Sequence, residues 1–181
     1  MPKPTSSYIA AMSVRFLLTQ LGKQFGYEEF DKNKHKKEWA EINEYFGGAC
    51  CYCGKKVDKP DVEHIIGFNK GDLGFDCLGN VAPACKRCNN DKPDNGISAW
   101  EIHLKKVCGT EDSFKRRREK ILSYMKKYNY PPSYFEEKIL LKYQKPIEDF
   151  YKKIVTYLED EKNSMLAGAL SSRKEFIWTE R

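Results

Sequence analysis

The sequence contains Cys50-Cys51-Tyr52-Cys53-Gly54 and Cys85-Lys86-Arg87-Cys88-Asn89, with 31 residues between Cys53 and Cys85, and these two stretches decide the fold of its centre. Each stretch holds a C-x-x-C knuckle, a tight turn that aims two thiolates at one point. Two such turns supply the four sulfur ligands of a tetrahedral zinc site. The spacing therefore predicts one structural Zn²⁺ bound by Cys50, Cys53, Cys85 and Cys88.

The cysteine count supports this interpretation. Seven is an odd number, and the chain begins without a signal-peptide pattern, so metal binding is favoured over disulfides. Buried free thiols or a redox pair are the alternatives, but a redox C-x-x-C normally occurs once, beside a βαβ pattern that is not visible here. Cys51, Cys77 and Cys108 have no partner at knuckle spacing and are expected to be packed or free thiols.

Polar groups stand beside short apolar runs in the segment between the knuckles. This segment reads Asp61-Val62-Glu63-His64-Ile65-Ile66 and then Gly79-Asn80-Val81, and the second knuckle continues as Asn89-Asn90-Asp91-Lys92. Taken alone, the Glu-His dipeptide is better explained as a satisfied core histidine beside a surface acid. The dipeptide is not alone, however, and the whole pattern has a chemical meaning.

The joint pattern resembles that of the HNH nuclease family, whose ββα-metal motif reads roughly C-x-x-C, Asp/Glu-His-Ile, Asn-Leu/Val and C-x-x-C-Asn-x-x-Lys. Residues 50–95, about a quarter of the chain, match it throughout as an H-N-N variant with signature positions His64, Asn80 and Asn89. The family usually has Asp before the histidine, where this sequence has Glu63. The expected fold is α+β, with a small zinc-stapled ββα-metal core flanked by N-terminal and C-terminal helices.

Phosphodiester hydrolysis explains the residue types. A histidine side chain is the residue type best suited to accept a proton at neutral pH, so His64 can take the proton of the attacking water. Glu63 and Asn89 are hard oxygen donors, which suit a catalytic Mg²⁺ or Mn²⁺ that stabilises the leaving oxygen. Neighbours in a regular strand point to opposite faces. Glu63 and His64 therefore share a site only if the strand end is irregular, or if metal and water lie on either side of one phosphate.

Other polar residues complete the predicted site. The resemblance implies that Asn80 fixes the loop between the two strands and so orients the histidine, while a simple Gly-Asn turn is the alternative. Lys92 is expected either to contact the phosphate or to face solvent. Asp72 and Asp76, in the loop over the site, could be accessory metal ligands but are interpreted as ordinary loop acids.

The net charge of +6 comes entirely from residues 104–142, which carry eleven basic and five acidic side chains. Such a patch attracts a polyanion, although a solvated helix face is the commoner explanation of a charge run. Lys115, Arg116 and Arg117 are the expected DNA contacts, and Arg118 lies nearer the apolar side of the helix. That apolar side is formed by Phe114, Ile121, Met125 and Tyr128.

Helical patterns flank the knuckle region on both sides. Helices are expected over 5–22, 31–46 and 113–128, after a capping box at 98–101, after a second capping box at 133–136, and from Pro146 through Leu158, with a looser tail from Asn163. Strands are expected over 62–66 and 81–84. These ranges predict an N-terminal helical region (1–47), a nuclease core (48–108) and a basic C-terminal helical region (109–181).

Together these features predict a metal-dependent DNA endonuclease that leaves 5′-phosphate and 3′-hydroxyl ends. Its compact form favours a cytoplasmic restriction or anti-phage enzyme acting on double-stranded DNA, with a homodimer as a possible assembly. A phage or homing nuclease and a non-catalytic zinc-knuckle DNA-binding module are the alternatives, and the module would not need the acid-histidine-asparagine set. No apolar run approaches the ~18 residues of a membrane span.

Overall fold

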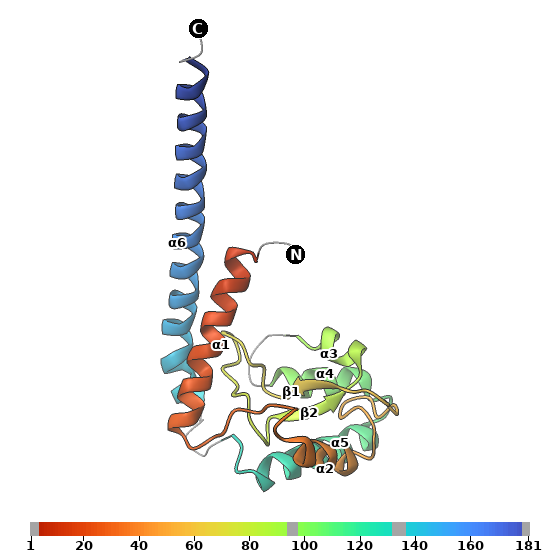
Figure 1. Cartoon of the computed structure of the whole chain (residues 1–181). Helices are drawn as coiled ribbons and strands as arrows, with labels where there is room; N and C mark the ends of the chain where they lie inside the picture. The colour runs from red at the N-terminus through yellow and green to blue at the C-terminus, as the bar shows by residue number, and fades with distance from the viewer. Residues whose placement is uncertain (1–3, 94–97, 132–136, 179–181) are drawn as a thin grey trace.

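The computed structural model describes residues 4–93, 98–131 and 137–178, and it describes side chains within 4–93, 98–131 and 142–165. Short helices surround an irregular centre that contains a two-stranded hairpin, and two long helices lie side by side at one edge of the molecule (Figure 1). The predicted α+β class is confirmed. In chain order the elements are α1 (Ser6–Gln24), α2 (Lys36–Tyr45), β1 (Asp61–His64), β2 (Val81–Ala84), α3 (Lys86–Asp91), α4 (Ala99–Val107), α5 (Glu111–Lys127) and α6 (Glu137–Trp178).

The antiparallel hairpin of β1 and β2 positions the central residues. The expected first strand was 62–66, but the ladder ends at His64. Ile65 and Ile66 leave it because Asn80 takes the place of a partner strand. Its backbone oxygen accepts from Ile65 N and its side-chain oxygen accepts from Ile66 N, both at 2.8 Å. A side chain thus ends the strand where a regular ladder would have continued.

The two long helices, α1 and α6, pack against each other. α1 begins after Thr5, whose side chain caps it by accepting from Tyr8 N at 3.2 Å. Its residues Val14 and Leu18 are buried in a small cluster with Ile147 of α6. Among the described residues, no helix is both long enough and apolar enough to cross a membrane.

α6 runs through two positions where the sequence predicts otherwise. Pro146, expected to begin a helix, lies inside α6, and the tail is helical rather than loose from Asn163 as far as Trp178. Proline removes one backbone hydrogen bond to the residue four positions earlier. Pro146 and Lys142 are both exposed, so the freed carbonyl can be hydrated, while Ile147 holds the helix against α1. The capping box at 133–136 lies outside the described residues.

α2 is shorter than the expected range of 31–46, because Asp31 and His35 form a turn of their own. His35 N donates to Asp31 O at 2.8 Å, and Asp31 N donates to His35 Nδ1 at 3.0 Å. Local hydrogen bonds of this kind compete with helix formation. The predicted end of the helix is confirmed at Gly47, whose φ of +73° suits the left-handed turn after a helix.

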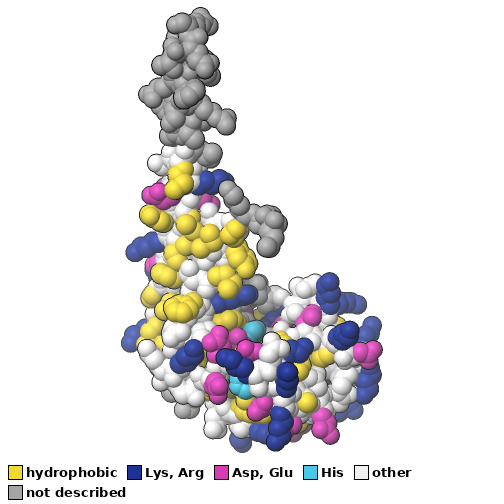
Figure 2. Space-filling view, viewed as in Figure 1, with side chains coloured by type: hydrophobic (Ala, Val, Ile, Leu, Met, Phe, Trp, Pro, Cys, Tyr) yellow, Lys and Arg dark blue, Asp and Glu magenta, His cyan; other side chains and the backbone are white. Residues whose placement is uncertain are grey.

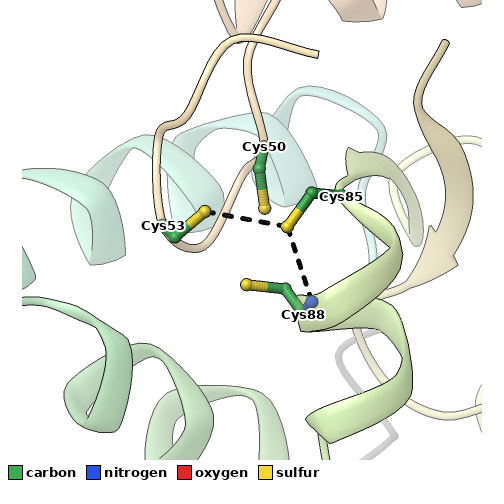
Figure 3. Close-up of side chains that lie close together, drawn as sticks. All are labelled: Cys50, Cys53, Cys85 and Cys88. Atoms are coloured by element: carbon green, nitrogen blue, oxygen red, sulfur yellow. Dashed lines mark hydrogen bonds between the residues drawn. The ribbon is translucent and has the colours of Figure 1, made fainter.

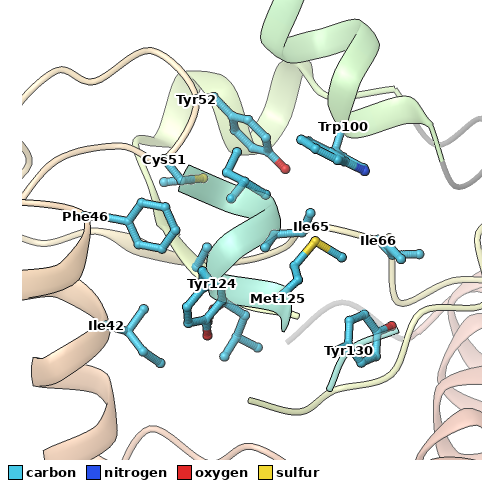
Figure 4. Packing of buried hydrophobic residues seen from close by; sticks show 14 of the residues in the cluster. Ile42, Phe46, Cys51, Tyr52, Ile65, Ile66, Trp100, Tyr124, Met125 and Tyr130 are labelled. Atoms are coloured by element: carbon cyan, nitrogen blue, oxygen red, sulfur yellow. Dashed lines mark hydrogen bonds between the residues drawn. The ribbon is translucent and has the colours of Figure 1, made fainter. Parts of the chain in front are cut away.

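One hydrophobic core joins the hairpin and first knuckle to α2, α4 and α5 (Figure 4). The predicted apolar stripe of α5 faces this core, with Ile121 and Met125 buried and Phe114 and Tyr128 half-buried. The core therefore crosses both expected segment boundaries, after residue 47 and after residue 108. The knuckle region packs together with its flanks.

Candidate functional site

The four knuckle cysteines meet at one point (Figure 3). The Sγ atoms of Cys50, Cys53, Cys85 and Cys88 all lie within 4.8 Å of one another, and Cys53 Sγ is 3.8 Å from Cys85 Sγ. Tetrahedral zinc with Zn–S bonds of about 2.3 Å places its sulfur ligands about 3.8 Å apart. The cluster is therefore compatible with the structural zinc that the sequence predicts, and it unites the predicted ligands.

The cysteine cluster also fixes the elements around it. Cys85 caps α3, and its sulfur accepts from Cys88 N at 3.5 Å. On the other side, Arg117 Nη1 of α5 donates to Tyr52 O of the first knuckle at 3.3 Å. The guanidinium lies where a Cβ on Gly54 would clash. Arg117, expected to bind DNA, therefore ties α5 to the knuckle, because the carbonyls of this tight turn attract a cation.

The three remaining cysteines lie outside the cluster, as expected. Cys51 and Cys77 are buried, and Cys51 lies in the packed core (Figure 4). Burial raises the pKa of both thiols, so they remain protonated at neutral pH. Cys108 is half-buried, with its Sγ 3.9 Å from Tyr52 O.

β1 presents different chemistry on its two faces, because successive side chains of a strand point to opposite sides. Asp61 and Glu63 face α3, where Asn89 Nδ2 donates to Asp61 Oδ2 at 3.3 Å and Lys92 Nζ lies 2.7 Å from Glu63 Oε1. His64 faces the interstrand loop and α1. Asn89 lines both cavities that His64 lines, and Glu63 lines the smaller of the two, so these two oxygen donors and the imidazole border the same small cavity.

Lys92 neither faces solvent nor reaches out toward a phosphate, the two positions that the sequence left open. Its side chain and that of Glu63 are each 5% exposed. Lys92 Nζ also donates to the backbone oxygens of His64 and Ile65, and Tyr52 OH donates to Glu63 Oε1 at 3.2 Å. Burial raises the pKa of Glu63, and the Lys92 ammonium opposes that rise. Lys92 is a buried counter-ion that holds the end of β1.

Replacing Lys92 by methionine should lower the free energy of unfolding by about 3–5 kcal/mol at neutral pH, because Glu63 would become a buried charge without a partner. The loss should shrink in mild acid. The variant raises the folded-state pKa of Glu63 further above its unfolded value, so the folded protein gains a proton first as the pH falls. Denaturant titrations at neutral and acidic pH measure both effects.

The control is the double variant Glu63→Gln/Lys92→Met, which removes the charge together with its partner. It should recover most of the stability that Lys92→Met loses, and the two single variants complete a double-mutant cycle. A Lys92→Met protein as stable as the wild type at neutral pH would show that the fold does not depend on this ion pair.

His64 lines an open cleft of about 780 Å³. Its Nε2 is 2.9 Å from Asp76 Oδ1, and its ring packs against Phe68 with the centroids 5.2 Å apart. The His64 side chain is 24% exposed, so a substrate can reach it. Asp76, interpreted from the sequence as an ordinary loop acid, therefore contacts the central imidazole. Asp72 is buried within the loop.

Asn80 is fully buried at the end of the loop that carries Phe68 and Asp76. Its side-chain oxygen accepts from Ile66 N at 2.8 Å, and its Nδ2 donates to Ile66 O at 2.9 Å and to Phe75 O at 2.7 Å. The amide thus closes the loop on itself. A loop-fixing role needs geometry of this kind, and Asn80 holds Ile65 and Ile66, the two residues that follow the histidine, rather than the histidine itself.

The opposite wall of the cleft is α1, which sequence reasoning left outside the site. Arg15, Phe16 and Lys23 line this wall, and Arg15 Nε donates to Phe68 O at 3.3 Å. One signal was available in the sequence: Arg15 interrupts the apolar run from Ile9 to Leu18. A charged residue at that position indicates that this side of the helix is not buried in the hydrophobic core.

Only some of the basic side chains at 115–118 of α5 are accessible to a ligand. Lys115 and Arg116 are exposed, as a phosphate contact requires. Arg118 instead forms two hydrogen bonds of 3.0 Å with Glu101 of α4, in keeping with its position near the apolar side. Together with the knuckle contact of Arg117, this leaves Lys115 and Arg116 as the accessible members of the predicted contacts.

Comparison with known proteins agrees with the motif. The chain is 28% identical over 83 residues to the "SPbeta prophage-derived putative HNH endonuclease YoqL" of Bacillus subtilis (strain 168), and the alignment covers 38% of this chain and 36% of that protein. The chain thus spans about a third of the length of this relative. No family model and no solved structure matches. Over part of its length, the chain is a distant homologue of a protein named as an HNH endonuclease.

Proposed function

We propose that this protein is a metal-dependent DNA endonuclease of the HNH type, which hydrolyses phosphodiester bonds to leave 5′-phosphate and 3′-hydroxyl ends. The placement of His64 carries the proposal: it is accessible in a cleft and bonded to Asp76, at the end of a hairpin that the cysteine cluster joins to Asn89. The distant homology supports the same activity. A DNA-binding module without catalysis would have no use for this arrangement.

His64 is the proposed general base. An ionised carboxylate accepts hydrogen bonds but cannot donate them, so Asp76 favours the tautomer of His64 that carries its proton on Nε2. Nδ1 then keeps the lone pair that takes a proton from the attacking water. Asp76 also stabilises the imidazolium that results, as an orienting carboxylate does beside other catalytic histidines. Asn80 positions both groups through the loop.

The oxygen donors on the α3 face of β1 suit a hard divalent cation. Glu63 and Asn89 are the predicted ligands, and Asp61 joins them because it lies two residues before Glu63 on the same face of the strand. When bound, Mg²⁺ or Mn²⁺ would supply Lewis-acid stabilisation of the departing 3′-oxygen.

Incubation of supercoiled plasmid with zinc-loaded protein tests the proposal. We expect nicked or linear DNA with Mg²⁺ or Mn²⁺ and uncut plasmid without them. A DNA ligase should reseal the products without prior phosphorylation, because the ends carry 5′-phosphate and 3′-hydroxyl groups. Adding excess Mg²⁺ after EDTA distinguishes loss of the catalytic ion from irreversible loss of zinc. Plasmid that is bound but never cut would contradict the proposal and favour the binding module.

The wider role is proposed on less specific features. The substrate is double-stranded DNA, with Lys115 and Arg116 as accessible contacts, and the location is the cytoplasm, where cysteines that form no disulfide, such as these seven, stay reduced. Residues 48–108 carry the histidine, the oxygen donors and the cysteine cluster, between flanking regions 1–47 and 109–181. Restriction or anti-phage defence remains the first candidate role. The prophage origin of the relative favours a phage nuclease as the second, and phage plating on expressing cells distinguishes them.

A homodimer also has support from the surface. Nine of the thirteen exposed large hydrophobic side chains among the described residues lie on α1 and α6. They form much of the apolar surface that covers the two helices in Figure 2. A second copy packed there would bury this surface and would bring a second cleft to the other strand of a duplex.

A further inference from the structure

The cleft beside His64 has two walls that come from distant parts of the chain. One wall is the hairpin with its loop, and the other is α1, which lies outside the segment that resembles the HNH motif. In Figure 2 the apolar surface over α1 and α6 gives way to charged and histidine side chains at the foot of α1. A substrate bound at His64 would therefore also meet α1.

Arg15 is the α1 residue that the geometry connects to the imidazole. It lines the 780 Å³ cleft and a smaller adjoining cavity of about 170 Å³, and His64 and Asn89 line both as well. Arg15 Nε donates to Phe68 O, and its guanidinium carbon lies 5.9 Å from the centre of the Phe68 ring. Because Phe68 packs against His64, one aromatic residue holds the guanidinium and the imidazole over the same cleft.

The charge of Arg15 is not neutralised by any side chain that the structure describes. Lys23 of the same wall is paired with Glu29 at 3.3 Å, and Lys92 is buried against Glu63. Arg15 differs from both, since no carboxylate pairs with it among the residues that the structure describes. Its Nε is held by a carbonyl oxygen, which leaves the two terminal nitrogens for an anion. A guanidinium fork matches two oxygens of a phosphate in spacing and charge.

We propose that Arg15 binds the scissile phosphate opposite His64 and stabilises the negative charge that develops on it during hydrolysis. This inference rests on the proposed function, because the reaction it concerns is the proposed hydrolysis of DNA. Arg15 itself belongs to α1, which lies outside the segment that resembles the HNH motif. A preorganised donor at a developing charge contributes ~10²–10³-fold to the rate. The competing explanation is that Arg15 only ties α1 to the loop through Phe68, in which case its loss would act on stability.

Single-turnover cleavage at saturating DNA, measured for Arg15→Gln and Arg15→Lys, distinguishes the two explanations. Arg15→Gln should cut ~10²–10³-fold more slowly with an unchanged thermal midpoint, and Arg15→Lys, which keeps the charge but not the fork, should fall between. Arg87→Gln is the matched control, because Arg87 is exposed, pairs with Asp91 and lies outside the cleft. Arg15→Gln cutting at the wild-type rate overturns the inference. The inference is also overturned if Arg15→Gln cuts slowly with a lowered thermal midpoint and Arg15→Lys restores neither the rate nor the midpoint.

A binding measurement makes the test independent of cleavage. In a His64→Ala background, Arg15→Gln should weaken binding of a fluorescent DNA duplex and reduce the slope of log K against log salt by about 0.9, the value of one phosphate contact. A wild-type protein that binds but never cuts would defeat the proposed endonuclease, while this slope would still test Arg15. An unchanged slope overturns the Arg15 inference even if the wild type cuts.

Discussion

Cys88→Ser should leave the centre of the protein unfolded. The two knuckles lie far apart in the sequence, so zinc binding and folding are expected to be coupled. In zinc-finger peptides the free energy of zinc binding is about 10–16 kcal/mol. This equals or exceeds the free energy of unfolding of a whole domain, which is about 5–15 kcal/mol. Elemental analysis should find about one Zn²⁺ per wild-type chain and far less in the variant, and circular dichroism should show loss of cooperative unfolding.

Cys108→Ser is the matched control, since Cys108 is half-buried and lies outside the cluster. It should retain zinc and a cooperative transition. The effect of Cys88→Ser should also reach the chemistry, because α3 begins at Cys85 and carries Asn89. A wild-type protein without zinc, or a folded and active Cys88→Ser protein, would remove the structural role from this cluster.

His64→Ala should abolish plasmid cleavage, with a loss of ~10²–10⁴-fold for the missing general base. DNA affinity and the thermal midpoint should stay close to those of the wild type. The side chain is 24% exposed and faces the cleft, so its removal costs little packing. Single-turnover rates at saturating DNA and fluorescence anisotropy measure the two properties separately.

Two further variants sharpen this test. Asp76→Asn keeps the shape of the partner but lets an amide donate to Nε2, which favours the wrong tautomer, so the rate should fall while binding persists. His35→Ala is the matched control, because His35 stands at the start of α2 and does not line the cleft, and its cleavage rate should be near that of the wild type. Asn89→Ala should mainly weaken the dependence on the divalent ion, whereas Glu63→Ala should also lower the free energy of unfolding, because it leaves the Lys92 ammonium buried without its partner. His64→Ala cutting at the wild-type rate would refute the active-site assignment.

The parts of this protein that could be predicted depend on neighbours in the chain. A C-x-x-C turn aims its two sulfurs by local geometry alone, and the observed cluster has the four predicted members. The helices α1 and α5 follow from apolar spacing and nearby caps, since Thr5 and Thr110 each accept from a backbone amide three residues on. The end of α2 at Gly47 is likewise local.

The misjudged positions depend on packing partners that spacing does not reveal. Pro146 usually begins or breaks a helix, yet contacts of Ile147 with α1 carry α6 past it. Lys92 was expected to contact a phosphate or to face solvent, but the buried carboxylate of Glu63 and the backbone oxygens of His64 and Ile65 hold its ammonium inside the protein. Arg117 similarly donates a hydrogen bond to the backbone oxygen of Tyr52, which lies 65 residues away in the sequence.

The sequence by itself determined the four cysteines, the hairpin with its histidine, and the polar residue types from which hydrolysis was inferred. Only the tertiary structure decided which charges are free to act. In the folded protein Lys92 is buried against Glu63, and Arg117 is hydrogen-bonded to the backbone of Tyr52. Asp76 contacts His64, and Arg15 contacts Phe68, which lies 53 residues away in the sequence. The physical reason is that a side chain's type and spacing follow from the local chain. Whether its charge is neutralised depends on groups that only the folded core brings within a few ångströms.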